Sequence, residues 1–166
     1  MLLVAFMALA AGVLVQSVMR DGAVNNASPK LTDFSFPDAA DHVQAISQWQ
    51  GKVLVINFWA TWCPPCLQEI PEFIKLQAEY QHLGLQFVGV AIDDKQSVAA
   101  YLQGININYP ILIAGDEGIG VSKQFGNILN AVPYTVIVNR LGQVIHRLPG
   151  EISREKLVEL VTPLIN

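Results

Sequence analysis

The chain has 166 residues, of which 52% are hydrophobic, and it carries a formal net charge of −4. A chain of this length holds one domain with a sizeable apolar core, so it does not need a disulfide scaffold to fold. Its 10 lysines and arginines are dispersed and form no basic stripe, which argues against nucleic acid as a partner.

The N-terminal residues 2–19 are uncharged and almost entirely apolar. As a helix this segment would be about 27 Å long, slightly short of the ~30 Å hydrocarbon core of a membrane. It fits either an uncleaved anchor or a signal segment cut near Ala8-Leu9-Ala10. Arg20 follows the apolar run and no basic residue precedes it, which opposes the orientation expected for export. We assign 1–20 to the anchor or signal segment, 21–30 to a polar linker and 31–166 to the domain.

The first elements of the domain are a short edge strand at 34–36 and a short helix within 41–49. A buried β-branched strand over 53–59 and a long helix over 64–82 follow. Pro71 lies inside this helix, but the apolar positions continue through it, so we expect a kinked helix rather than a later start.

The remaining elements alternate between strands and helices until a final hairpin. We expect strand 85–92, helix 97–102, strand 109–114, helix 121–125, strands 134–138 and 144–148, and helix 154–161. A turn at 139–142 joins the last two strands. This order predicts one α/β domain with a mixed central sheet flanked by helices.

The only cysteines, Cys63 and Cys66, enclose two prolines at the junction between strand 53–59 and helix 64–82. Unpaired N–H groups and the helix dipole favour a thiolate at the first position, and the second lies one helical turn away. The alternative is half of a zinc site, which needs four ligands. No second Cys-x-x-Cys exists and the three histidines are scattered, so the pattern favours a redox pair over a metal site.

Residues 58–66, with the sequence Phe-Trp-Ala-Thr-Trp-Cys-Pro-Pro-Cys, and the later Val132-Pro133 resemble the thioredoxin superfamily. Within that superfamily the chain more closely resembles the TlpA/ResA-like membrane-anchored thiol–disulfide oxidoreductases, and the resemblance covers about residues 30–165. This resemblance implies a thioredoxin-like fold. Residues 96–126 are similar to the helix–strand insertion of the TlpA-like branch.

The resemblance also assigns roles to residues near the cysteine pair. Cys63 would be the exposed nucleophile, and Cys66 would resolve the mixed disulfide. Pro133 would be a cis proline facing the pair, the alternative being an ordinary trans turn proline. The Val132 backbone would hold an extended substrate segment by strand-like pairing. Trp62 is expected to pave the surface beside Cys63.

Asn57, Glu69 and Tyr134 either differ from the residues of related proteins or allow two structural interpretations. Asn57 stands where ordinary thioredoxins keep a buried aspartate, and it cannot take up a proton. Glu69 lies three residues after Cys66, either as a half-buried carboxyl that accepts the proton of the resolving thiol or as a solvated helix residue. Tyr134 stands where many relatives have threonine, and it either lines the substrate groove or packs in the core. Asp93 and Asp94 end a strand and read as a turn.

The resemblance implies a thiol–disulfide oxidoreductase that needs no cofactor and no metal. We expect a monomeric domain on the periplasmic or other extracytoplasmic side of a membrane, attached through residues 2–19. It would reduce disulfides of exported proteins, in cytochrome c maturation first and copper-site assembly second, and a transmembrane electron donor would recharge it. The alternatives are a module that binds copper or a peptide on its Cys-x-x-Cys face, and a disulfide oxidase of the DsbA type.

Overall fold

The computed structural model describes residues 31–166. The expected anchor or signal segment at 1–20 and the linker at 21–30 therefore lie outside the described residues. Within 31–166, no helix combines the length and the apolar character that a membrane crossing requires.

A five-stranded mixed sheet forms the centre of the domain, with strand order β5-β4-β3-β6-β7. Strands β3, β4 and β5 are parallel, whereas β6 runs antiparallel to both β3 and β7. The strands are β3 (Val53–Trp59), β4 (Leu85–Ala91), β5 (Ile111–Ile113), β6 (Tyr134–Val138) and β7 (Val144–Pro149). The prediction of a mixed central sheet is confirmed.

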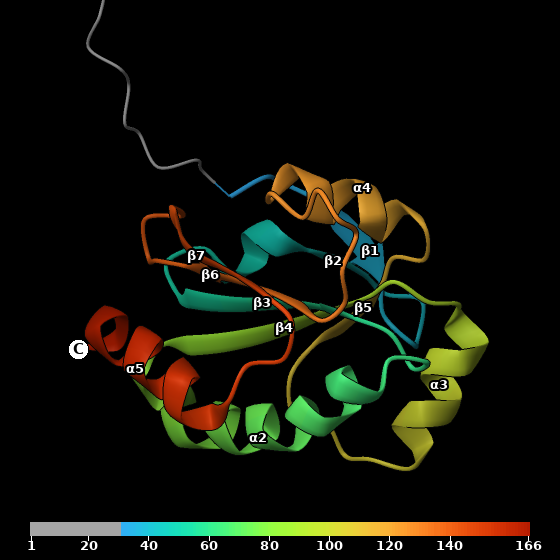
Figure 1. The fold of residues 1–166 in the computed structure, drawn as a ribbon, viewed down its shortest axis with the longest axis horizontal. Coiled ribbons are helices and arrows are strands. Elements are labelled where there is room, and N and C mark those ends of the chain that lie inside the picture. Colours follow the sequence, from blue (N-terminus) through green and yellow to red (C-terminus); the bar gives the residue numbers. More distant parts are fainter. Residues whose placement is uncertain (1–30) are drawn as a thin grey trace, which may run out of the picture.

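Four α-helices surround this sheet. They are α2 (Pro64–Tyr80), which continues into the 3₁₀ turn η2 (Gln81–Leu83), α3 (Lys95–Gln103), α4 (Glu117–Gln124) and α5 (Arg154–Ile165). Helices α2 and α5 cover one face of the sheet and α4 covers the other, while α3 lies beyond the end where the parallel strands finish (Figure 1). Helix α2 contains Pro71 within its length, as predicted.

The N-terminal part of the domain differs from the prediction. Strand β1 (Ser35–Pro37) pairs antiparallel with β2 (Val43–Ala45) in a separate two-stranded sheet, and only the 3₁₀ turn η1 (Ile46–Trp49) is helical. The expected helix within 41–49 is therefore wrong in its first half. The Asp38 carboxylate causes the difference, because it accepts hydrogen bonds from the backbone N–H groups of Ala40 and His42 and so folds a hairpin turn.

The segment between β4 and β6 contains α3, β5 and α4, so the expected helix–strand insertion over 96–126 is present. Its strand β5 pairs with the last three residues of β4 and forms one edge of the sheet. The insertion therefore extends the sheet next to the end that carries the cysteine pair.

Strand β3 lies at the middle of the sheet, and all seven of its residues are buried. Because successive side chains point to opposite faces, Leu54, Ile56 and Phe58 join the cluster on the α4 side. Val53, Val55 and Trp59 join the cluster under α2 and α5. Asn57 is the one polar residue of β3, and its position in this alternation places it on the α2 face.

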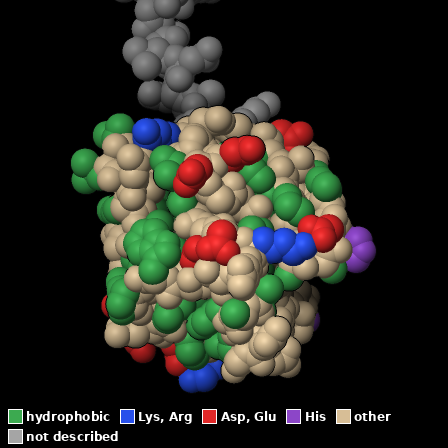
Figure 2. All heavy atoms as spheres, turned by 90° about the vertical axis from the view of Figure 1, so that its right-hand side faces the viewer, with side chains coloured by type: hydrophobic (Ala, Val, Ile, Leu, Met, Phe, Trp, Pro, Cys, Tyr) green, Lys and Arg blue, Asp and Glu red, His purple; other side chains and the backbone are tan. Residues whose placement is uncertain are grey.

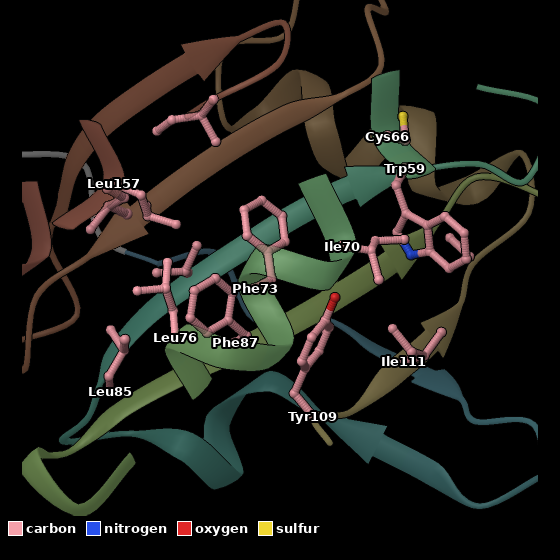
Figure 3. Close-up of a cluster of buried hydrophobic side chains, with 14 of the residues drawn as sticks. Trp59, Cys66, Ile70, Phe73, Leu76, Leu85, Phe87, Tyr109, Ile111 and Leu157 are labelled. Carbon is pink, nitrogen blue, oxygen red and sulfur yellow. The ribbon is translucent and has the colours of Figure 1, made fainter. Parts of the chain in front are cut away.

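The cluster under α2 contains an aromatic contact between that helix and the sheet. Phe73 of α2 and Phe87 of β4 have ring centroids 5.1 Å apart, and Figure 3 shows the two rings together beside Leu76. Both phenylalanines are essentially inaccessible to solvent. This contact fixes α2 on the sheet, and α2 carries the cysteine pair at its N-terminus.

We predict that Phe73→Ala lowers the free energy of unfolding by about 3–5 kcal/mol, because it removes buried area and leaves a cavity. Leu141→Ala is the matched control, since Leu141 is 78% exposed, and it should change stability by less than about 0.5 kcal/mol. Urea unfolding of both variants measures the difference. Equal stabilities of the two variants would contradict the packing described here.

Candidate active site

The cysteine pair lies where β3 passes into α2. Strand β3 ends at Trp59, a three-residue loop follows, and Cys63 is the N-cap of α2. Its sulfur accepts a hydrogen bond from the Cys66 N–H at 3.3 Å, which satisfies one of the free N–H groups of the first turn. Pro64 and Pro65 occupy the first helical positions, where a missing N–H costs nothing.

The two cysteines form a disulfide, with Cα atoms 5.3 Å apart. Cys66 is fully buried, and Cys63 keeps 3% of its surface. The prediction that Cys63 is exposed is therefore wrong for the oxidised pair, in which Cys63 is almost completely buried. Its sulfur is bonded to that of Cys66, and its N–H donates to the Ala60 carbonyl. Cys63 is nevertheless the one member of the pair that solvent reaches.

Asp93 holds the loop in front of Cys63. One carboxylate oxygen accepts the Thr61 N–H at 2.8 Å and the Thr61 hydroxyl at 2.6 Å. Asp94 caps α3 by accepting the Ser97 N–H. Reading Asp93 and Asp94 only as a turn missed both functions. The available signal was topological, since the parallel strands β3 and β4 end at the same edge of the sheet.

Trp62 directly precedes Cys63 in the chain, and Val132-Pro133 directly precedes β6. Trp62 is 64% exposed, as expected for a residue that paves the surface next to Cys63. The Val132–Pro133 peptide is cis, as predicted, and Pro133 is buried. The register aligns Phe58 of β3 with Tyr134 of β6. Pro133 therefore lies at the end of the sheet where β3 finishes and the loop to Cys63 begins.

Tyr134 belongs to the core, which decides between its two readings in favour of packing. It is 3% exposed, its ring lies 6.4 Å from that of Phe58, and its hydroxyl donates to the Phe125 carbonyl at 3.0 Å. Tyr134 also contributes to the lining of a surface pocket, together with residues of the segment 126–131.

Glu69 is buried, which excludes the solvated-helix reading. One carboxylate oxygen accepts the Asn57 side-chain amide at 2.7 Å, and the other accepts the Ile152 N–H at 3.2 Å. The same Asn57 amide donates to the Thr135 hydroxyl at 3.0 Å. Glu69 therefore links α2 to β3, to β6 through Asn57, and to the segment that leads into α5.

Burial raises the pKa of Glu69 from 4.5 to about 7, since removal from water penalises the charged form. The hydrogen bonds from Ile152 and Asn57 act in the opposite direction, and the nearby charge of Glu151 adds a smaller increase. The carboxyl thus exchanges a proton in the neutral pH range, one helical turn from Cys66.

Sequence reasoning missed two members of the hydrogen-bond network around Glu69, namely Thr135, which accepts from Asn57, and the Ile152 N–H, which donates to Glu69. Thr135 had a visible signal, because it is the single polar residue in an otherwise apolar buried strand, as Asn57 is in β3. The Ile152 N–H had none, since backbone groups carry no sequence signature. Within residues 31–166, no group of three or more His, Cys, Asp or Glu side chains is arranged to hold a metal ion.

Comparison with known proteins agrees with this geometry. The family model described as Redoxin matches residues 24–161. The chain is similar to the thiol–disulfide oxidoreductases named ResA from Halalkalibacterium halodurans, at 26% identity over 86% of this chain and 81% of that protein. It is also similar to ResA from Geobacillus kaustophilus, at 27% identity over 81% of this chain and 74% of that protein.

A solved structure of a thiol:disulfide interchange protein of the thioredoxin family from Chlorobium tepidum shares the fold. The two structures have a TM-score of 0.76 at 26% sequence identity, over 86% of this chain and all of the other. The fold, the Cys63–Cys66 disulfide at a helix N-terminus and the relatives lead to one assignment. The chain belongs to the Redoxin family and is a thiol–disulfide oxidoreductase with a thioredoxin-like fold.

Proposed function

We propose that the protein reduces disulfides of exported proteins. The Cys63 thiolate attacks a substrate disulfide and releases one substrate thiolate, leaving a mixed disulfide. The Cys66 thiolate then attacks the Cys63 sulfur, releases the second substrate thiolate and closes the Cys63–Cys66 disulfide. Two electrons pass to the substrate, and the oxidised pair in the structure corresponds to the product state.

The positions of the two cysteines on α2 support this assignment of roles. Cys63 is the N-cap of α2 and keeps 3% of its surface accessible, whereas Cys66 lies within the first turn and is fully buried. The helix N-terminus favours a thiolate at Cys63. We therefore assign Cys63 as the nucleophile and Cys66 as the resolving thiol from their positions on α2.

The loop before β6 supports binding of an extended substrate segment. Among the described residues, neither the N–H nor the C=O of Val132 has a hydrogen-bond partner. Val132 is half-buried and lies next to the buried Pro133 at the active edge of the sheet. Free backbone groups in this position suit strand-like pairing with a substrate, while the exposed Trp62, which precedes Cys63 in the chain, offers an apolar surface.

Glu69 is the proposed proton acceptor for Cys66. Resolution requires the Cys66 thiol to lose a proton, and Cys66 is sealed from solvent. Glu69 lies on the same helical face with a pKa of about 7, close to the value that suits general base catalysis at neutral pH.

The direction of transfer and the partners extend the proposal. Among residues 31–166, the Cys63 sulfur of the disulfide accepts a hydrogen bond from the Cys66 N–H and none from a Lys, Arg or His side chain, and the motif at 58–66 contains no basic residue. This supports a thiolate without the cationic stabilisation of a strong oxidant. A reductant in an oxidising compartment must be recharged, which implies a transmembrane electron donor. We place the domain outside the cytoplasm, attached or targeted through residues 2–19, with apocytochrome c cysteines as first candidate substrate.

The two cysteine variants should behave differently. Cys66→Ser keeps the nucleophile but cannot resolve, so it should accumulate mixed disulfides with substrate proteins. Cys63→Ser should form none and should lose disulfide reduction completely. Non-reducing gel analysis of each variant after exposure to a disulfide-containing protein measures the trapped species. Trapping by Cys63→Ser instead would reverse the two roles.

Glu69→Gln should remove a pH dependence of stability. In the wild type Glu69 titrates near 7 when folded and near 4.5 when unfolded. Between these values the folded state binds more protons, so the free energy of unfolding falls as pH rises, by about 3 kcal/mol in total. The difference between wild type and variant in urea unfolding at pH 4.5 and pH 8 isolates this contribution.

The same variant should slow disulfide exchange and shift its pH profile, because the proton acceptor is gone. Glu159→Gln is the matched control, since the Glu159 side chain is 66% exposed on α5. It should leave both the stability profile and the exchange rate unchanged. Identical behaviour of Glu69→Gln and Glu159→Gln would remove Glu69 from the mechanism.

The compartment is tested with a reporter enzyme that is active only in the cytoplasm, fused after residue 30. The proposal predicts an inactive reporter, because the first 30 residues would carry it across the membrane. The same fusion lacking residues 2–19 should be active and serves as the control. Strong activity of the intact fusion would contradict export.

A further inference from the structure

A closed turn stands directly in front of Val132. The Asn127 side-chain amide donates to the Ala131 carbonyl at 2.8 Å, and its side-chain oxygen accepts the Ala131 N–H at 3.0 Å. The Asn127 N–H donates to the Ser122 carbonyl of α4, and Asn130 takes up the left-handed backbone conformation with φ 53°. These bonds close the turn and fasten it to α4, so its tip is held in place before any partner binds.

The tip of this turn presents two large apolar side chains to water. Ile128 is 84% exposed and Leu129 is 86% exposed, more than any other large hydrophobic residue within 31–166. A scattered exposed leucine needs no explanation, but two neighbouring apolar residues on a fastened turn form a contact surface. The face at the active edge of the sheet shows hydrophobic side chains gathered along its left border and acidic and basic ones near its centre (Figure 2).

A surface pocket of about 290 Å³ lies beside this tip, and its lining includes Ile128, Leu129, Tyr134, Arg147 and Pro149. Its apolar walls come from both sides of the Val132-Pro133 loop. Arg147 donates its Nε–H to the Phe125 carbonyl at 2.9 Å, which fixes one positive charge at the pocket. No acidic residue is part of the lining.

We propose that Ile128, Leu129 and the pocket beside them select the polypeptide segment that flanks the substrate cysteine. This inference rests on the proposed function, since a segment paired with the Val132 backbone would pass the turn. Side chains of an extended segment alternate, so a residue next to the cysteine can enter the pocket. The apolar walls favour a large apolar side chain there, and Arg147 disfavours lysine or arginine. Substrates would therefore be disulfides within apolar, non-basic sequence.

Three synthetic peptides, each with one intramolecular disulfide, test the selection. They differ only in the residues on both sides of the cysteines, which are leucine, serine or lysine. The reduced full-length protein should reduce the leucine peptide at least about fivefold faster than the serine peptide, and the lysine peptide should be slowest. Oxidised glutathione, which carries no such segment, provides the reference rate.

The double variant Ile128→Ser/Leu129→Ser should bring the leucine and serine peptides to within about twofold of each other, with an unchanged rate on oxidised glutathione. Arg147→Gln should raise the reduction rate of the lysine peptide to that of the serine peptide. Leu141→Ser, an exposed leucine on the β6–β7 turn, is the matched control and should keep the wild-type preference.

Two negative results have different meanings. If wild type reduces all three peptides at one rate, or if the double variant keeps the leucine preference, the selection is wrong while the reductase function stands. If wild type reduces neither the peptides nor glutathione, the proposed function fails and the selection falls with it.

Discussion

The structure around the Cys63–Cys66 pair depends on the hydrogen bonds of the buried Glu69 carboxyl. Its two oxygens accept hydrogen bonds from Asn57 on β3 and from the Ile152 N–H ahead of α5. Asn57 in turn donates to Thr135 on β6. The Glu69 side chain of α2 is thereby linked directly to β3 and to the segment before α5, and through Asn57 to β6. A buried acid is tolerated here because each oxygen is satisfied, and its cost appears as a raised pKa.

Polar side chains make two separate sets of hydrogen bonds near the cysteine pair, one inside the domain and one in the surface loops. On the inner side, the buried Glu69 carboxyl has a pKa raised to about 7 and accepts a hydrogen bond from the Asn57 side-chain amide. On the outer side, Asp93 holds Thr61, and Asn127 holds the turn that leads to Val132. Each outer loop is fastened by a buried or half-buried polar side chain, so the surface around Cys63 is shaped before a substrate arrives.

Much of the fold was predictable from the sequence, because β3, β4 and β6 are mostly apolar runs and α2 has clear helical spacing. The cysteine motif located the junction of β3 and α2, and the resemblance around Val132-Pro133 predicted the cis peptide before β6. Prediction failed where one polar side chain overrides local pattern. Asp38 turns residues 43–45 into a strand, and Asp93 proved to be an anchor rather than a turn residue.

Burial was the other property that the sequence left open. Helical spacing placed Glu69 on the face of Cys66 but could not distinguish a buried acid from a solvated one. That outcome depends on Asn57, Thr135 and the Ile152 N–H, which come from three distant segments. The Asn127 turn also lacked a sequence signal, because its importance arises from two reciprocal bonds to Ala131.

The proposed function requires the Cys63–Cys66 pair to donate electrons to its substrate rather than withdraw them. The reduction potential of the pair, measured by equilibration with glutathione buffers, tests it most directly. Within the described residues no Lys, Arg or His side chain donates a hydrogen bond to the Cys63 sulfur, so we expect a potential near that of thioredoxin, about −270 mV, and far from the value of about −120 mV for DsbA. A potential above about −180 mV would contradict the assignment as a reductant.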